Sequence, residues 1–235
     1  MNAQKYIEES SELKKYFSEF TSADIEKIDL IEYPAGSIIN DQDTDENSVF
    51  FLVQGIGAVY RKIETGELFK YYYITKNDVF GLSDVIDPNK IGSYYTIKAM
   101  NDIILLKVTQ TQLNKFKADY PKFENRIVIG IIERLHQALT VHVECKKYNS
   151  TINIVSYLIF TYEIYHTMYD SNYIGYVPIN ETRATISDFT GISIRSINNT
   201  IDLLKKLNYI SVIKGKVNIN IKEYATLKSY KASNI

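Results

Sequence analysis

The sequence predicts an α+β protein with an N-terminal antiparallel β-barrel or jelly roll, a long helix, and a C-terminal winged helix-turn-helix. Three observations support this prediction. Short β-branched and aromatic runs fill residues 31–110, a heptad-like apolar stripe follows at 127–145, and a glycine separates two short amphipathic segments within 182–207. The expected boundaries are 1–120 for the barrel, 121–148 for the long helix and 149–235 for the winged domain.

The composition indicates a folded cytoplasmic protein. Of the 235 residues, 45% are hydrophobic and 23% are charged, which is enough for a core and argues against disorder. Cys145 is the single cysteine, so no intrachain disulfide can form. We expect no signal peptide and no membrane partner, because the N-terminus has no long apolar run and the other apolar runs are short.

The charge is distributed unevenly. Residues 176–235 hold nine Lys and Arg against four Asp and Glu, a balance of +5, whereas the whole chain is −1 and the remainder is therefore −6. A basic segment on an acidic body favours a polyanionic partner. A merely solvated lysine-rich surface would show the same charges.

The N-terminal region reads as short helices followed by strands. Thr21 precedes an acidic first turn and is expected to cap a helix within residues 1–30. Between residues 31 and 110, six short runs alternate with turn signals such as Pro34-Ala-Gly36. This spacing is typical of a small antiparallel barrel or jelly roll.

A short helix from Thr109 and a long helix from Pro121 follow the strands. The apolar positions of the long helix recur every three or four residues, at Ile127, Ile131, Leu135, Ala138, His142 and Cys145, widened by Val128, Ile132 and Leu139. Such a seam predicts pairing with a second copy of the chain. An ordinary core-facing helix is the alternative interpretation.

Another helix is expected from Ile152 to Tyr169, and then the helix-turn-helix. Thr182 and Ser193 are placed to cap its two helices, and Gly191 provides a left-handed turn between them. The second helix buries one stripe, formed by Ile197, Ile201 and Leu204.

The other side of that second helix is polar. Its side chains, together with a basic hairpin tip at Lys214 and Lys216, suit a helix that reads DNA base edges and a wing that contacts phosphates. Glycine-linked helices also occur in purely structural bundles, but the wing and the local charge favour double-stranded DNA. The expected DNA-binding residues are Thr182, Arg183, Ser193, Ile194, Arg195, Ser196, Asn198, Asn199, Lys214 and Lys216.

This order of parts resembles the Crp/Fnr family of bacterial transcription regulators over nearly the whole chain. The matching segments are Tyr33–Ile39, Val49–Arg61, Asn77–Gly81, Thr182–Ser193 and Leu203–Ile210. The resemblance implies a cyclic-nucleotide-binding-domain-like barrel and a homodimer on a two-fold-related DNA site, with RNA polymerase as a further candidate partner.

The resemblance also assigns roles in the second domain. It places Thr182, Arg183 and Ser193 at phosphate-contacting positions. It places Ile194, Arg195 and Asn199 at base-reading positions, where the family's catabolite activators carry Arg, Glu and Arg. The operator should therefore differ, and an Asn–adenine contact suggests an A·T-rich half-site. Thr185 stands where the family has a capping-box glutamate.

The resemblance does not extend to the cyclic-nucleotide cassette of the family. Leu82 stands in the place of the glutamate that holds ribose, and Ser93 in the place of the arginine that holds phosphate. We expect no response to cyclic AMP, and the effector is unknown. An effector pocket would involve Gly81, Leu82, Ser83, Ser93 and Tyr94.

No catalytic, metal-binding or cofactor-binding residues are expected. One cysteine cannot hold an iron–sulfur cluster, and residues 31–110 contain no histidine for a catalytic metal in the barrel. His142 and Cys145 read as ordinary interface residues, and the alternatives are a haem or metal at the interface or redox sensing by the Cys145 thiol. The alternative function is a ligand-binding regulatory module without a direct role on DNA.

Overall fold

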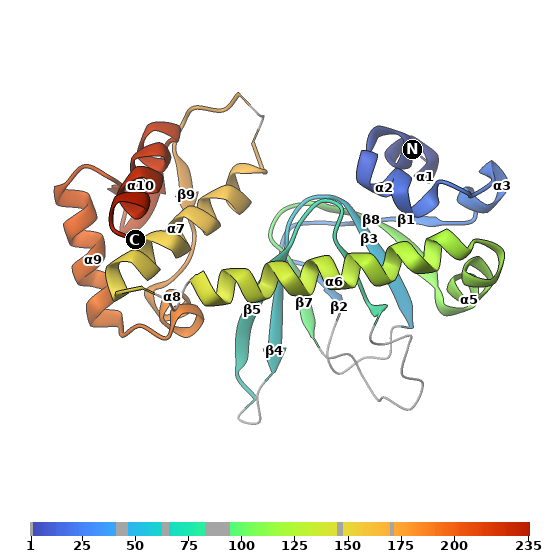
Figure 1. The fold of residues 1–235 in the computed structure, drawn as a ribbon, viewed down its shortest axis with the longest axis horizontal. Helices are drawn as coiled ribbons and strands as arrows, with labels where there is room; N and C mark the ends of the chain where they lie inside the picture. The colour runs from blue at the N-terminus through green and yellow to red at the C-terminus, as the bar shows by residue number, and fades with distance from the viewer. Residues whose placement is uncertain (1, 41–46, 63–65, 83–94, 145–147, 170–171) are drawn as a thin grey trace. The chain divides into compact units, whose positions relative to one another are not determined.

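The computed structural model describes residues 2–40, 47–62, 66–82, 95–144, 148–169 and 172–235 (Figure 1). The chain forms two compact units, Met1–His136 and Gln137–Ile235. No helix of the described residues is both long enough and apolar enough to cross a bilayer.

The first unit begins with three short helices, α1 (Ala3–Glu9), α2 (Ser11–Phe17) and α3 (Ser22–Ile25), and Thr21 caps the third as expected. The strands that follow are β1 (Asp29–Tyr33), β2 (Ile38–Asn40), β3 (Ser48–Gln54), β4 (Gly57–Lys62), β5 (Leu68–Ile74), β6 (Val79–Phe80), β7 (Thr96–Ala99) and β8 (Ile103–Thr109). Two helices end the unit, α5 (Gln110–Asp119) and α6 (Pro121–Glu144), and α6 continues into the second unit.

The strands form two antiparallel sheets with the orders β1-β8-β3-β6 and β2-β7-β4-β5. No described strand joins one sheet to the other, so the unit is a jelly roll and not a closed barrel. The expected antiparallel fold is confirmed in this form.

Strand β3 shows how the layers pack, because both of its faces are buried. Phe50 and Leu52 lie in the core between the two sheets. Phe51, from the opposite face, belongs to a second core with Leu13 of α2 and Phe123 of α6. This arrangement explains why β3 reads as a continuous apolar run instead of alternating with polar residues.

The second unit contains α7 (Ser150–His166), β9 (Val177–Ile179), α8 (Arg183–Thr190), α9 (Ile194–Lys206), β10 (Ser211–Ile213), β11 (Lys216–Ile219) and α10 (Ile221–Ser233) (Figure 1). Its sheet has the order β10-β11-β9 and is antiparallel throughout. The described part of α7 is buried along most of its length and packs against α8, α9, α10 and β9.

Four features of this unit differ from the sequence-based expectation. Helix α7 ends at His166, short of Tyr169. The alternating residues Val217–Ile221 predict the second strand of a hairpin, whereas β11 ends at Ile219, because Asn220 caps α10 in a capping box with Glu223. Strand β9 and helix α10 were not expected.

Candidate nucleic-acid interface

Helices α8 and α9 form the expected helix-turn-helix, and local hydrogen bonds explain the turn. The Thr182 hydroxyl accepts a hydrogen bond from the Thr185 backbone N–H at 3.0 Å. At the end of α8, Gly191 has φ +71° and its N–H donates to the Ser187 carbonyl at 2.8 Å. Both features close the short helix through bonds between residues three or four positions apart.

Ser193 caps the N-terminus of α9 in the same manner as Thr182 caps that of α8. Its hydroxyl accepts a hydrogen bond from the Ser196 N–H at 3.2 Å and lies 3.0 Å from the Ser196 hydroxyl. In α8 the Thr182 and Thr185 hydroxyls lie 2.9 Å apart. A hydroxyl residue therefore stands at the third position of both helices, where a capping box has Glu or Gln, and its side chain contacts the cap hydroxyl.

Neither helix has an acidic residue in its first turn. The partial positive charge of the backbone N–H groups at each start is therefore not compensated within the helix. Such a pair of helix starts is favourable for anions such as phosphates.

Helix α9 divides into a buried stripe and an exposed polar surface. Ile197, Ile201 and Leu204 are at most 3% exposed, which confirms the predicted stripe. Ser196 is half-buried, and the other predicted reading residues of this helix are exposed, namely Ile194, Arg195, Asn198 and Asn199.

The wing is the hairpin of β10 and β11. Lys214 has φ +49° and Gly215 has φ +78°, as a two-residue type I′ turn requires. The exposed Lys214 and Lys216 flank this glycine, as expected for a basic tip.

Strand β9 links the wing to the start of α8. Val217 of β11 pairs with Ile179, and the Lys216 ammonium donates to the Asn180 side-chain carbonyl at 2.7 Å. Asn180 lies two residues before the Thr182 cap. Reasoning from sequence missed Asn180, because a three-residue strand containing Pro178 gives no usable periodicity.

Arg183, the first residue of α8, is half-buried. Burial lowers the pKa of its guanidinium from the usual value, and the carboxylate of Asp202 on α9 opposes that shift. Arginine remains charged at physiological pH in such a setting. The Asp202 carboxylate thus favours the charged form of Arg183, an effect that the sequence did not indicate.

Helix α6 carries a long exposed apolar surface. Its members, which we call the α6 stripe, are exposed by 49%, 53%, 57%, 54% and 57% in the order Val128, Ile132, Leu135, Leu139 and Val143. Ile129 and Ile131 flank the stripe and are also exposed.

The α6 stripe lies further around the helix axis than the predicted seam does. Ile127 is 6% exposed and packs in the core of the first unit, so its assignment to a free seam is wrong. Ile131 and Leu135 are exposed. Ala138 and His142 lie within α6, and Cys145 lies outside the described residues.

Two of the expected effector-pocket residues are described, Gly81 and Leu82; Ser83, Ser93 and Tyr94 lie outside the described residues. Gly81 has φ +84°, and a Cβ there would lie 2.2 Å from the Ser48 carbonyl oxygen. Leu82 is 9% exposed and belongs to the core that packs sheet β1-β8-β3-β6 against the helices. Both residues thus serve the packing of the fold.

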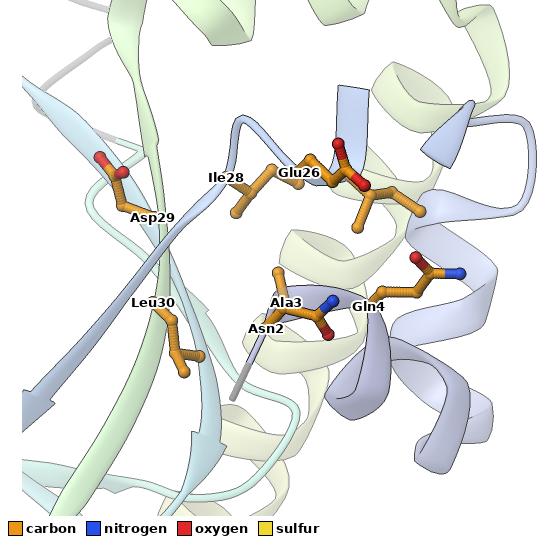
Figure 2. A pocket seen from close by; sticks show the side chains of 8 residues that line it. Asn2, Ala3, Gln4, Glu26, Ile28, Asp29 and Leu30 are labelled. Atoms are coloured by element: carbon orange, nitrogen blue, oxygen red, sulfur yellow. The ribbon is translucent and has the colours of Figure 1, made fainter. Parts of the chain in front are cut away.

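A pocket of about 320 Å³ lies in the first unit beside α1 and β1 (Figure 2). Its lining residues are Asn2, Ala3, Gln4, Ile25, Glu26, Ile28, Asp29 and Leu30. Glu26 and Asp29 are exposed, and their carboxylates lie apart in Figure 2. The pocket therefore lacks converging polar groups, and none of its residues belongs to the expected effector site.

The residues that the structure describes contain no group of three or more His, Cys, Asp or Glu side chains able to hold a metal ion.

Comparison with known proteins identifies a domain family for part of the first unit and the fold of the chain. Residues 30–120 match the family of cyclic nucleotide-binding domains. A Crp/Fnr-family regulator of Eubacterium rectale is 15% identical, with 91% of this chain and 97% of that chain covered and a TM-score of 0.68. The chain has the fold of the Crp/Fnr transcription regulators.

Other structures with the Crp/Fnr fold are as distant in sequence. A CRP-family regulator of Thermus thermophilus is 16% identical, covering 86% of this chain and 96% of that chain, with a TM-score of 0.66. The c-di-GMP responsive global regulator of Xanthomonas campestris is 9% identical, covering 85% and 99%, with a TM-score of 0.63. No curated protein matches the sequence of this chain. The neighbours named here are transcription regulators and not enzymes.

Proposed function

We propose that this chain is a homodimeric, sequence-specific DNA-binding transcription regulator that cyclic AMP does not control. The observation that carries the proposal is α9, an amphipathic helix with a fully buried inner stripe and an outer side of Arg, Asn and Ser. Its first turn has no carboxylate, and Lys214 and Lys216 are exposed on the wing of the same unit. These groups suit base edges in the major groove and the phosphates beside it.

The proposed division of roles follows the exposure of the side chains. Arg195 and Asn199 are exposed, lie four residues apart, and therefore share one side of α9. Arginine bonds guanine O6 and N7, and asparagine bonds adenine N6 and N7. The hydroxyls of Thr182 and Ser193 and the guanidinium of Arg183 would contact phosphates, which position the protein without reading sequence.

DNA binding is tested by selecting an operator from random duplexes with the full chain and measuring affinity across a salt series. We expect the logarithm of the affinity to fall linearly with the logarithm of the salt concentration. Arg195→Ala should lose about 1–3 kcal/mol on the selected operator. Arg61→Ala is the matched control, because Arg61 is an exposed arginine on β4 of the other unit. Equal affinities for the two variants would refute the assignment of Arg195.

Self-association rests on the α6 stripe. Five large aliphatic residues, each about half-exposed, follow one side of a single helix at steps of four, three, four and four residues. The first three steps follow the alternation of a two-helix seam, and a second copy of the helix offers a surface of the same kind. The Crp/Fnr fold of the chain agrees with a dimer.

Dimerisation is tested by sedimentation equilibrium. Leu139→Lys places a charge inside the α6 stripe and should yield monomers that no longer bind the operator. Thr140→Lys is the control, since it adds the same charge one residue later, rotated by about 100° around the helix. A dimeric Leu139→Lys protein would refute the seam.

Independence from cyclic AMP is supported by Leu82. The side chain in the ribose-holding position is an aliphatic group packed in the core under the N-terminal helices. A structural neighbour responds to c-di-GMP, so regulators with this fold do not all use one ligand. Calorimetry with cyclic AMP should show no binding at millimolar concentration. Micromolar binding would overturn this part of the proposal.

A further inference from the structure

The isoleucine at the start of α9 stands at the edge of the buried stripe but is only partly covered by the packing of the unit. Ile194 is the first helical residue after the Ser193 cap and is 47% exposed, while the neighbouring stripe residues Ile197 and Ile201 are buried. A large apolar side chain left in water at the tip of a reading helix suggests that it contacts an apolar group of the ligand.

The major groove offers one apolar group to such a side chain. The 5-methyl group of thymine is the apolar feature among the base edges, whereas guanine, adenine and cytosine present donors and acceptors there. Isoleucine can neither donate nor accept a hydrogen bond, so placing it against guanine or cytosine would remove water from polar atoms without replacing their bonds.

The exposed residue one helical turn after Ile194 also suits an A·T pair. Asn198 lies one turn after Ile194, is exposed, and bears an amide that can bond adenine N6 and N7. Two residues one turn apart thus match the bases of A·T pairs. Ile194 suits thymine by apolar contact, and Asn198 suits adenine by hydrogen bonding.

We propose that Ile194 is a specificity-determining residue that packs against the 5-methyl group of a thymine in each half-site. The inference rests on the proposed DNA-binding function and assigns one base of the operator. It predicts that the methyl group itself, and not only the identity of the base pair, contributes to affinity.

The test replaces thymine by deoxyuridine at each position of the selected operator, one position at a time, with the full-length protein. At the contacted position the loss of one methyl should weaken binding by about fourfold in one half-site and about sixteenfold in both. Ile194→Ala should bind the thymine and uracil operators equally.

Two controls separate a methyl contact from other causes. Ile221→Ala removes the same atoms from a residue that is also the first of its helix and 40% exposed, but on α10, and it should retain the thymine preference. An operator with cytosine at the contacted position lacks the methyl group, and 5-methylcytosine restores it. This replacement should strengthen binding by the natural protein about fourfold and leave binding by Ile194→Ala unchanged.

The outcomes distinguish this inference from the function on which it rests. If an operator is selected and bound but uracil is tolerated at every position, or penalised equally in Ile194→Ala, the assignment of Ile194 is wrong and DNA binding stands. If no operator emerges and binding does not depend on salt, the proposed function fails and the assignment fails with it.

Discussion

The turn of the helix-turn-helix allows a stability change to be worked out from the structure. Gly191 has φ +71°, and a Cβ added there would meet no atom within 4 Å. Gly191→Ala therefore creates no clash, and its cost is that of holding an L-residue in the left-handed region, about 1–2 kcal/mol. Alanine also has fewer conformations than glycine in the unfolded chain, which stabilises the folded state by about 0.4–1 kcal/mol. The net loss of unfolding free energy should therefore be about 1 kcal/mol.

This value is measured by urea unfolding, with the melting temperature as a second readout. A loss of this size corresponds to a fall of about 2–4 °C in melting temperature for a chain of this length. Gly191→Asn should cost less, because asparagine tolerates left-handed dihedrals. A loss above about 3 kcal/mol for alanine, or equal losses for alanine and asparagine, would refute the reasoning, since both results require a contact that the structure does not show.

Three further changes test other parts of the fold. The Lys27 ammonium hydrogen-bonds to Asp24 and holds the pKa of that carboxyl well below its usual range, so Asp24→Asn should lower the urea midpoint at pH 7. This difference should shrink as pH falls below about 4, through the folded pKa, and an undiminished difference at pH 2 would contradict it. Gly130→Ala should lower the free energy of unfolding by about 1–3 kcal/mol despite the better helix propensity of alanine, because its Cβ would lie 2.4 Å from the buried Tyr16 hydroxyl. A rise in stability would show that this ring yields easily. Ser193→Ala should lose about 1 kcal/mol of unfolding free energy with the cap of α9, and unchanged stability would argue against the cap.

The local features of the reading unit were predictable because each depends on residues only a few positions apart. Thr182 and Ser193 cap their helices through bonds that span three residues. Gly191 turns the chain by its own dihedrals, and the stripe of α9 is set by helical periodicity. The type I′ turn at Lys214 and Gly215 belongs to the same class.

The missed features depend on partners distant in the chain. Val177–Ile179 is a strand because β11 pairs with it, and three residues carry too little pattern to show that beforehand. The bond between Asn180 and Lys216 follows from this pairing. Helix α10 carried a usable local signal, the Asn220 and Glu223 capping box.

By itself, the sequence determined that α6 is a long helix with apolar residues on more than one side. Only the tertiary structure decided which side is free, because the helices and sheet of the first unit bury Ile127 and leave Val128 and Ile132 exposed. The physical reason is that periodicity defines a face of a helix relative to its own axis. The direction in which that face points is set by the surface on which the helix packs.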